Sequence, residues 1–221
     1  MKNHTIVAGY GTMGRGAVET LLANGTTSPE QIVVIDPLAS AVASAREAGC
    51  IAILDDATRT AALQQSRVET ARAVIVTCNR DDTATLVTLT ARELNRDVPI
   101  SAAVREAENA HLLSQSGATT VVLSSEAAGR LVGLSTEFPG AVGVLEDLLM
   151  VGAGLELIER TVEADEVGGP PARSAGLPIA LIRGATRIPF DDAAFQDTQP
   201  GDVVVCLTGR RGRRAPMPSP A

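Results

Sequence analysis

The sequence predicts an α/β protein: a doubly wound parallel sheet, then a short helical crossover and a small α+β unit. Short runs rich in Val and Ile alternate with helix-length amphipathic segments up to residue 123. A glycine-rich turn follows the first run, and beyond residue 152 strand-like runs continue without long helices between them. Strands separated by helices need right-handed crossovers, so the first part is expected to form a parallel sheet covered on both faces.

Six apolar runs are predicted strands, because each is rich in Val and Ile and bounded by turn residues or charges. They are His4–Ala8, Ile32–Ile35, Ile51–Leu54, Ala73–Thr77, Ile100–Val104 and Thr120–Leu123. The amphipathic segments between them are predicted helices, over Arg15–Ala23, Ala39–Ala48, Arg59–Gln65, Thr83–Leu94 and Glu106–Ser114. This order is typical of doubly wound sheets, which bind ligands at the carboxyl ends of their strands.

Two short apolar helices are predicted after the sixth strand. Ser124 and Ser125 can cap the first, which runs to Leu134. A Phe138-Pro139-Gly140 break separates it from the second, over Val142–Leu149. The pair either packs on the same domain or is covered by another subunit, and we favour the second interpretation because the Pro-Gly break suits a hinge.

The C-terminal part is predicted to be a separate small α+β domain, since Gly and Pro punctuate short strands there. The strands are Leu155–Ile158, Ala180–Arg183, Thr186–Ile188 and Val203–Leu207. The basic, Pro-rich tail is expected to be disordered and solvated, with contact to anionic lipid or RNA as the weaker alternative. The predicted division is an N-lobe over residues 1–135, a crossover or hinge over 136–151, a C-lobe over 152–209 and the tail over 210–221.

The composition argues against several functional classes. A net charge of −7 argues against a general nucleic-acid binder, and no apolar run approaches the length of a membrane span. The chain leads directly into a strand pattern, so no signal peptide is expected and the protein is predicted to be cytoplasmic. Cys50, Cys78 and Cys206 are far apart and are predicted to be reduced core residues. Two histidines, His4 and His111, are too few for a His-rich metal site.

The first predicted strand ends in a G-x-G-x-x-G turn that opens the first helix, a pattern typical of Rossmann-like nucleotide-binding folds. The residues are Gly9, Tyr10, Gly11, Thr12, Met13 and Gly14. The first glycine permits the tight turn, the second lets a pyrophosphate approach the backbone, and the third allows close helix–strand packing. The helix N-terminus offers unpaired N–H groups and a partial positive charge to phosphates. We therefore predict that this turn binds a nucleotide.

Asp36 ends the second predicted strand. A carboxylate at this position can accept hydrogen bonds from both ribose hydroxyls of an adenosine, and it would repel a 2′-phosphate. The sequence therefore favours NAD or an adenine nucleotide over NADP. The alternative is that Asp36-Pro37 is only a turn that ends the strand.

Further polar residues follow the next three strands, where ligands of such sheets bind. They are Asp56 and Ala57 after the third strand, Thr77 and Asn79 after the fourth, and Arg105 after the fifth. Arg105 can reach a phosphate as a fork-shaped donor. The alternatives are that Asp56 or Asp81 only caps the next helix, and that Arg105 is an ordinary exposed arginine.

The chain is poor in groups that catalyse proton transfer. A hydride-transferring dehydrogenase usually needs His, Lys or Tyr for this purpose. Lys2 is the only lysine and Tyr10 the only tyrosine, neither is placed for a Tyr/Lys dyad, and His111 falls on a predicted helix surface. We therefore predict a ligand sensor that is not an enzyme. The alternative is a small NAD-dependent oxidoreductase; a redox-sensing repressor would need a helix-turn-helix, which we do not find.

Several motifs recur together in one known family. They are His4–Gly11, Asp56-Ala57-Thr58, Ala71–Val76, Asp81-Asp82, Ser116-Gly117-Ala118, Gly129-Arg130-Leu131, Arg183-Gly184 and Pro200-Gly201-Asp202. In this combination the chain resembles the regulator-of-potassium-conductance (RCK, or TrkA-type) domains of potassium channels and transporters over nearly its whole length.

The resemblance implies a Rossmann N-lobe, a crossover helix pair that interlocks two subunits, and a small C-lobe of the TrkA-C type. Such dimers commonly assemble into rings beneath a potassium pore, encoded on the same or a separate gene, and ligand binding drives gating. The implied ligand is an adenine nucleotide, NAD(H) or ADP/ATP. The residues implied to contact it are Gly9, Gly11, Gly14, Asp36, Asp56 and Arg105. Membrane contact would come only through the pore partner, and no nucleic-acid partner is implied.

Two positions depart from the family pattern. Asp55 stands where the family usually has glycine, which changes the turn or adds charge near the ligand. Calcium-gated members carry carboxylates on and just after the fifth strand, where this chain has Ala103 and Arg105. That calcium site is therefore predicted to be absent, because an arginine opposes a hard cation. Whether acidic residues elsewhere bind a cation stays open.

Overall fold

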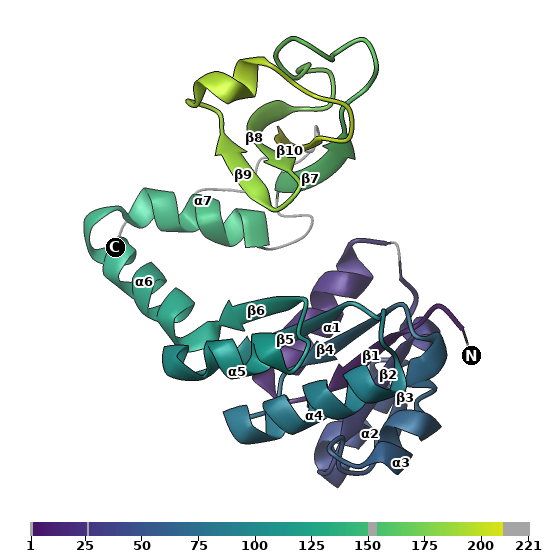
Figure 1. Cartoon of the computed structure of the whole chain (residues 1–221). Coiled ribbons are helices and arrows are strands. Elements are labelled where there is room, and N and C mark those ends of the chain that lie inside the picture. The colour runs from purple at the N-terminus through teal and green to yellow at the C-terminus, as the bar shows by residue number, and fades with distance from the viewer. Residues whose placement is uncertain (1, 26, 150–153, 210–221) are drawn as a thin grey trace. The chain divides into compact units, whose positions relative to one another are not determined.

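The computed structural model describes residues 2–25, 27–149 and 154–209. The chain divides into two compact units, with the boundary between Glu137 and Phe138 (Figure 1). None of the helices within the described residues is both long and apolar enough to cross a bilayer. The predicted tail over residues 210–221 lies outside the described residues. The division into four segments that the sequence indicated stays a prediction.

The N-terminal unit is built on a six-stranded parallel sheet with the order β3-β2-β1-β4-β5-β6. Its strands are β1 (Thr5–Ala8), β2 (Ile32–Asp36), β3 (Ile51–Leu54), β4 (Ala73–Val76), β5 (Ile100–Val104) and β6 (Thr120–Leu123). All neighbouring pairs in this sheet are parallel. The strand order reverses between β1 and β4, so the sheet is doubly wound as predicted, with its switch point beside the glycine turn.

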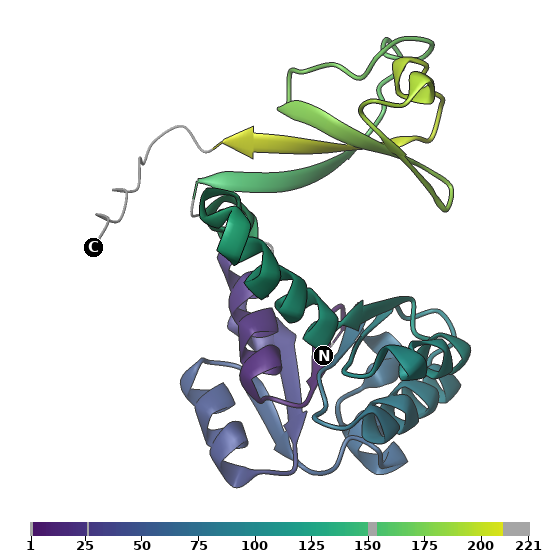
Figure 2. The same cartoon turned by 90° about the vertical axis from the view of Figure 1, so that its left-hand side faces the viewer.

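Helices cover both faces of this sheet (Figure 2). They are α1 (Thr12–Ala23), α2 (Ala39–Glu47), α3 (Thr60–Gln65), α4 (Asp81–Leu94) and α5 (Ala110–Gln115), with 3-10 turns at Pro29–Gln31, Val68–Thr70 and Ala107–Asn109. On one face Val18 of α1 and Ala45 of α2 join the core beneath Val34. On the other face α3, α4 and α5 bury their apolar sides in a second core. The central strands β1 and β2 are nearly continuous apolar runs because both of their faces are buried.

Several helix starts differ from the sequence prediction, and those of α1 and α5 have a clear physical reason. The first helix was expected from Arg15, but α1 begins at Thr12 because the glycine turn continues directly into it, with the Arg15 N–H donating to the Gly11 carbonyl. The fifth was expected from Glu106, but α5 begins at Ala110. The Asp81 carboxylate accepts the N–H groups of Arg105 and Glu106 and holds these residues in the loop after β5.

The predicted helix pair is present as α6 (Ser124–Glu137) and α7 (Pro139–Leu149), both wholly within the described residues. A break separates the two helices as expected, but it is confined to Phe138, because α7 begins at Pro139 and not at Val142. Ser124 does not act as the predicted cap but lies in the helix, where its hydroxyl donates to the Val104 carbonyl. No residue of either helix is buried, and Val132 and Leu149 are 70% and 66% exposed.

The C-terminal unit contains α7 and an antiparallel sheet with the order β7-β10-β8-β9. Its strands are β7 (Leu155–Thr161), β8 (Leu177–Arg183), β9 (Thr186–Pro189) and β10 (Val203–Gly209), each longer than predicted, and a 3-10 turn spans Ala193–Gln196. Leu181, Val204 and Cys206 form the centre of a small core with Phe195 and Ile188. The small α+β unit predicted from the sequence is therefore confirmed.

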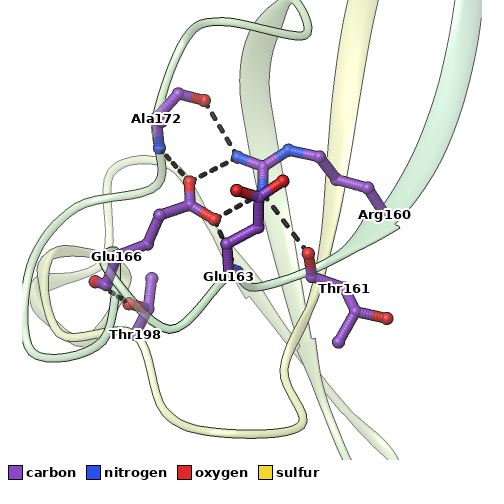
Figure 3. Close-up of polar contacts among 6 residues, drawn as sticks. All are labelled: Arg160, Thr161, Glu163, Glu166, Ala172 and Thr198. Atoms are coloured by element: carbon purple, nitrogen blue, oxygen red, sulfur yellow. Dashed lines mark hydrogen bonds and ion pairs between the residues drawn. The ribbon is translucent and has the colours of Figure 1, made fainter.

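A buried ion pair fixes the long connection between β7 and β8 (Figure 3). The Arg160 guanidinium donates to both Glu166 carboxylate oxygens, at 2.5 and 2.6 Å. Glu166 also accepts the N–H groups of Glu163 and Ala172, at 2.8 and 2.6 Å. A second pair, Arg183 with Asp202, joins β8 to the turn before β10. In each pair the carboxylate is buried with several donors, as a charge needs when it leaves water.

Candidate nucleotide-binding site

A cavity of about 270 Å³ opens at the carboxyl edge of the parallel sheet. The ends of β1, β2, β3 and β4 form its walls, at the point where the strand order reverses. Its lining residues are Gly9, Gly11, Ile35, Asp36, Pro37, Leu38, Asp56, Ala57, Thr77, Cys78, Asn79, Arg80 and Thr83. The cavity therefore lies where ligands of doubly wound sheets bind. It brings together Gly9, Gly11, Asp36, Asp56, Ala57, Thr77 and Asn79 from the predicted set.

Two glycines of the turn are required by packing within the protein. Gly9 has φ +94°, and a Cβ there would lie 2.8 Å from the Thr77 carbonyl oxygen. The Thr77 hydroxyl donates to the Gly9 carbonyl at 2.8 Å and keeps the turn against β4. A Cβ on Gly14 would lie 2.1 Å from the Gly9 carbonyl oxygen. Helix α1 therefore approaches the turn too closely for any side chain at Gly14, as the motif predicts.

Packing within the protein does not require a glycine at position 11. Its φ is −74°, which any residue adopts, and the atom nearest to a Cβ placed there is Asn79 Oδ1, at 3.8 Å. The space in front of Gly11 belongs to the cavity. A side chain at this position would fill the cavity and would not clash with the protein. The backbone of Gly11 is thus left open to the close approach of another molecule.

The N-terminus of α1 faces the same region. Gly11 is the N-cap, it has no side chain to satisfy the first N–H groups, and the first turn of α1 carries no acidic residue. Thr12 and Met13 follow the N-cap, and their backbone N–H groups belong to this first turn. The helix end therefore combines free donors with a partial positive charge.

Asp36 ties the end of β2 to the glycine turn. One carboxylate oxygen accepts the Tyr10 N–H at 2.7 Å, and the other accepts the Leu38 N–H at 2.8 Å. The side chain is buried, yet Asp36 also lines the cavity. The carboxylate therefore closes the turn at Pro37, as the alternative interpretation expected. The ribose contact stays a prediction, for which lone pairs remain at the cavity wall.

The side chain of Tyr10 does not line the main cavity. It is 4% exposed and packs in the core with Val7, Val18 and Ile32. Tyr10 borders a neighbouring hollow of about 210 Å³ that shares Gly11, Asp36, Leu38 and Asn79 with the main cavity. The contribution of Tyr10 to a ligand site therefore comes through its main chain.

The two aspartates after β3 both close turns. Asp56 Oδ1 accepts the N–H and the hydroxyl of Thr58, at 2.9 and 2.8 Å. Asp55, which departs from the family pattern, accepts the Asp56 N–H at 2.8 Å and pairs with Arg59. Asp56 lines the cavity and Asp55 does not.

Cys78 was not predicted to be a site residue, although it follows β4 between Thr77 and Asn79. Burial, with the nearby charges of Asp56 and Asp36, raises the pKa of its thiol to about 12. The thiol donates to the Ala8 carbonyl at 3.7 Å. It stays protonated at neutral pH and cannot serve as a nucleophile there.

Arg105 lies beside the main cavity and does not line it. Together with Arg80, Asp81, Asp82, Glu106 and Asn109 it borders an adjoining hollow. Asp81 accepts the Arg105 and Glu106 N–H groups and the Asn109 amide, at 3.0, 3.1 and 2.9 Å. Burial opposes the charged form of Asp81, but these hydrogen bonds outweigh it and lower the pKa of the carboxyl. Asp81 thus joins α4 to the loop after β5, a role that the capping interpretation did not include.

Residues 5–124 match the family model of the TrkA-N domain. The chain belongs to the TrkA-N domain family. The matched residues include all six strands of the parallel sheet and every residue predicted to bind nucleotide. Among the described residues of this TrkA-N protein, no group of three or more His, Cys, Asp or Glu is placed to hold a metal ion.

Relatives of this TrkA-N protein include named potassium channels. It is 23% identical over 177 residues to Potassium channel protein 1 of Methanocaldococcus jannaschii, a match that covers 80% of this chain and 53% of that protein. The chain spans between 24% and 54% of the length of the four curated relatives it matches.

Solved structures carry the same fold. The TrkA-N domain of the inner membrane protein YbaL from Escherichia coli is 29% identical, with a TM-score of 0.55 over 60% of this chain and 95% of that one. The GsuK structure bound to ADP is 25% identical, with a TM-score of 0.55 over 62% of this chain and 35% of that one. The GsuK RCK domain aligns over 94% of this chain and 44% of that one at 21% identity, with a TM-score of 0.55, and supports the fold of both units. The recognised family and fold class are therefore confirmed.

Proposed function

We propose that this TrkA-N protein is a regulatory module that binds an adenine nucleotide and thereby controls a potassium channel or transporter. The observation that carries the proposal is Gly11, whose missing side chain leaves the cavity open although nothing in the protein requires a glycine there. A glycine kept for space in front of a helix N-terminus suits the approach of a phosphate chain.

The remaining contacts follow from the geometry of the cavity. The first N–H groups of α1 would receive the phosphates, and the Asp36 carboxylate would accept the ribose hydroxyls. Leu38 is 62% exposed and lines the cavity beside Asp36, so it offers an apolar surface to the adenine. Asp56 and Asn79 also line the cavity and add polar groups to it. A 2′-phosphate beside Asp36 would be repelled, so NAD(H) or ADP/ATP is expected and NADP is not.

We propose regulation and not catalysis because the cavity offers little for proton transfer. The Tyr10 ring is in the core, and the Cys78 thiol is protonated at neutral pH. His111 lies exposed on α5 and is not among the residues that line the cavity. The relatives named as potassium channels, and the GsuK channel solved with ADP and with NAD, support the same assignment. Oxidation of NADH in the presence of a substrate would overturn it.

Coupling to a pore requires that the nucleotide bind one conformation of an assembly better than another, since only differential affinity shifts a population. We propose that α6 and α7 mediate this assembly by packing against a second copy of the chain. Val132 on α6, Phe138 between the helices and Leu149 on α7 are 70%, 55% and 66% exposed, so each segment has an apolar side chain available for such a contact. A dimer, a ring of dimers and a place at the cytoplasmic face of the membrane beneath a pore are part of this proposal.

Thermal unfolding with NAD, NADH, NADP, ADP and ATP tests the binding step. A ligand at 100 times its dissociation constant should stabilise the protein by ~2.7 kcal/mol. We expect a shift with NAD(H) or ADP/ATP, none with NADP, and none with any of them in Asp36→Arg. The absence of any shift would overturn the proposal. If a pore reconstituted with the Asp36→Arg protein gates as it does with the wild type, the nucleotide-binding site still stands, but the proposed regulatory role is overturned.

A further inference from the structure

Arg80 occupies a position that the nucleotide proposal does not yet use. It is the last residue before α4 and lines both the main cavity and the adjoining hollow that contains Arg105. Its side chain is 76% exposed. Among the described residues that line the main cavity, Arg80 carries the one positive charge, while Asp36 and Asp56 carry negative charges.

This charge balance is unfavourable for phosphates. The backbone N–H groups at the start of α1 supply hydrogen bonds and a partial charge, but the two carboxylates repel an anion in the same cavity. A cation at the rim is needed to offset that repulsion. A guanidinium is suited to this role because its fork of N–H donors matches the oxygens of a phosphate.

Asp82 holds the Arg80 guanidinium in the present structure. Arg80 Nε and Nη2 donate to the two Asp82 oxygens at 3.0 and 2.6 Å. The hydrogen bonding between the two side chains is the main reason why the pKa of Asp82 is lowered and that of Arg80 is raised. Asp82 Oδ1 also accepts the Thr83 N–H at 2.7 Å, so the carboxylate keeps a partner when the guanidinium leaves. Exposed ion pairs of this kind contribute little to stability, so exchanging one anion for another is easy.

We propose that Arg80 binds the phosphates of the nucleotide and makes the site selective for nucleotides with more phosphate charge, and that Asp82 competes with them for the guanidinium. This inference rests on the proposed nucleotide function, whose adenosine contacts do not involve Arg80. Arg80 therefore acts on the anionic end of the ligand, and Asp82 keeps it beside the cavity in the free protein.

Calorimetric titration of the whole chain with adenosine, AMP, ADP and ATP tests the inference. In Arg80→Ala we expect ADP and ATP to bind about tenfold more weakly, with adenosine unchanged. Arg80→Lys keeps the charge without the fork and should lie between Arg80→Ala and the wild type. Asp82→Asn should bind ADP about two- to fivefold more tightly at low salt, because the competing carboxylate is gone. Arg46→Ala is the matched control, since it removes one exposed positive charge near the end of α2, away from the cavity lining.

The outcomes separate the two proposals. If the wild type binds ADP and Arg80→Ala binds it equally well, the inference about Arg80 is wrong and the nucleotide site stands. Equal weakening of adenosine and ADP would also overturn it, because Arg80 would then act on the adenosine end. If the wild type binds neither these four ligands nor NAD(H), the nucleotide function itself fails, and this inference fails with it.

Discussion

The Asp36 carboxylate accepts the backbone N–H of Tyr10 at 2.7 Å, and this bond joins the end of β2 to the glycine turn after β1. The same carboxylate accepts the Leu38 N–H, so one buried side chain fixes two loops of the cavity. The residue that the sequence predicts to bind the ribose is thus part of the framework that holds the glycine turn in place.

Asp36→Ala should therefore weaken both folding and binding, whereas Asp36→Asn should affect them differently. Alanine leaves two backbone N–H groups without their acceptor, so we expect the free energy of unfolding to fall by about 2 kcal/mol. Asparagine keeps one acceptor oxygen, so Asp36→Asn should lower the free energy of unfolding by about half as much. It should nevertheless remove most of the contact to the ribose hydroxyls. Urea denaturation and nucleotide titration measure the two effects. The exposed Asp97→Ala serves as a control, and an Asp36→Ala protein as stable as the wild type would contradict the framework role.

Gly11 and Gly14 make a matched pair of substitutions. Gly14→Ala places a Cβ against the Gly9 carbonyl, so we expect it to lower the free energy of unfolding by about 3 kcal/mol. Gly11→Ala meets open space and should change stability by less than about 1 kcal/mol, while weakening nucleotide binding roughly tenfold. Thermal unfolding with and without ADP separates the two. Normal nucleotide affinity in a folded Gly11→Ala protein would show that the space before Gly11 is not a phosphate site.

Glu166 makes the C-terminal unit sensitive to acid. The hydrogen bonds that Glu166 accepts, above all from Arg160, lower the pKa of its carboxyl from 4.5 to about 2, although burial acts in the opposite direction. A depressed carboxyl pKa stabilises the folded state above the unfolded pKa, and this contribution disappears as the pH falls from about 4.5 to 2. Glu166→Gln should reduce stability by about 2 kcal/mol at pH 7 and flatten the pH dependence in that window.

Tyrosine fluorescence and far-UV circular dichroism together show whether the effect of Glu166→Gln on stability is confined to the C-terminal unit. The chain has no tryptophan and a single tyrosine, Tyr10, which lies in the N-terminal core. Its fluorescence therefore reports on that unit alone, whereas far-UV circular dichroism reports on both. We expect Glu166→Gln to alter the acid transition seen by circular dichroism and to leave the Tyr10 transition unchanged. A pH profile identical to that of the wild type by both signals would mean that Glu166 is not stabilised as its contacts imply.

The strands of the sheet were predictable because each is a short apolar run, whether it is buried throughout, as β1 and β2 are, or partly exposed, as the edge strands β3 and β6 are. The ranges of β3, β5 and β6 match the prediction at both ends. The start of α5 was not predictable, because it depends on Asp81 accepting N–H groups 24 and 25 residues away in the sequence. Local propensity contains no information on such a contact.

The site was predictable in its backbone but less so in its side chains. The G-x-G-x-x-G spacing fixes how the turn runs, yet the burial of the Tyr10 ring depends on the core between α1 and β2. The sequence did not indicate Arg80 as a site residue, since a lone arginine before a helix is common on protein surfaces. It did not indicate the role of Glu166 either, because the partners of Glu166 come together only when the loop after β7 folds back.

Cys78 should be a slow target for alkylation although it lines the cavity. With a thiol pKa of about 12, its thiolate is scarce at pH 8, so iodoacetamide should modify it about a thousandfold more slowly than an exposed cysteine of ordinary pKa. Peptide mapping by mass spectrometry after timed labelling measures the rate, and the urea-unfolded chain supplies the reference rate for the same peptide. Because Asp56 and Asp36 contribute to the raised pKa, Asp56→Asn should speed the reaction. Rapid labelling of the folded wild type would instead identify Cys78 as a reactive thiol and reopen the case for catalysis in this cavity.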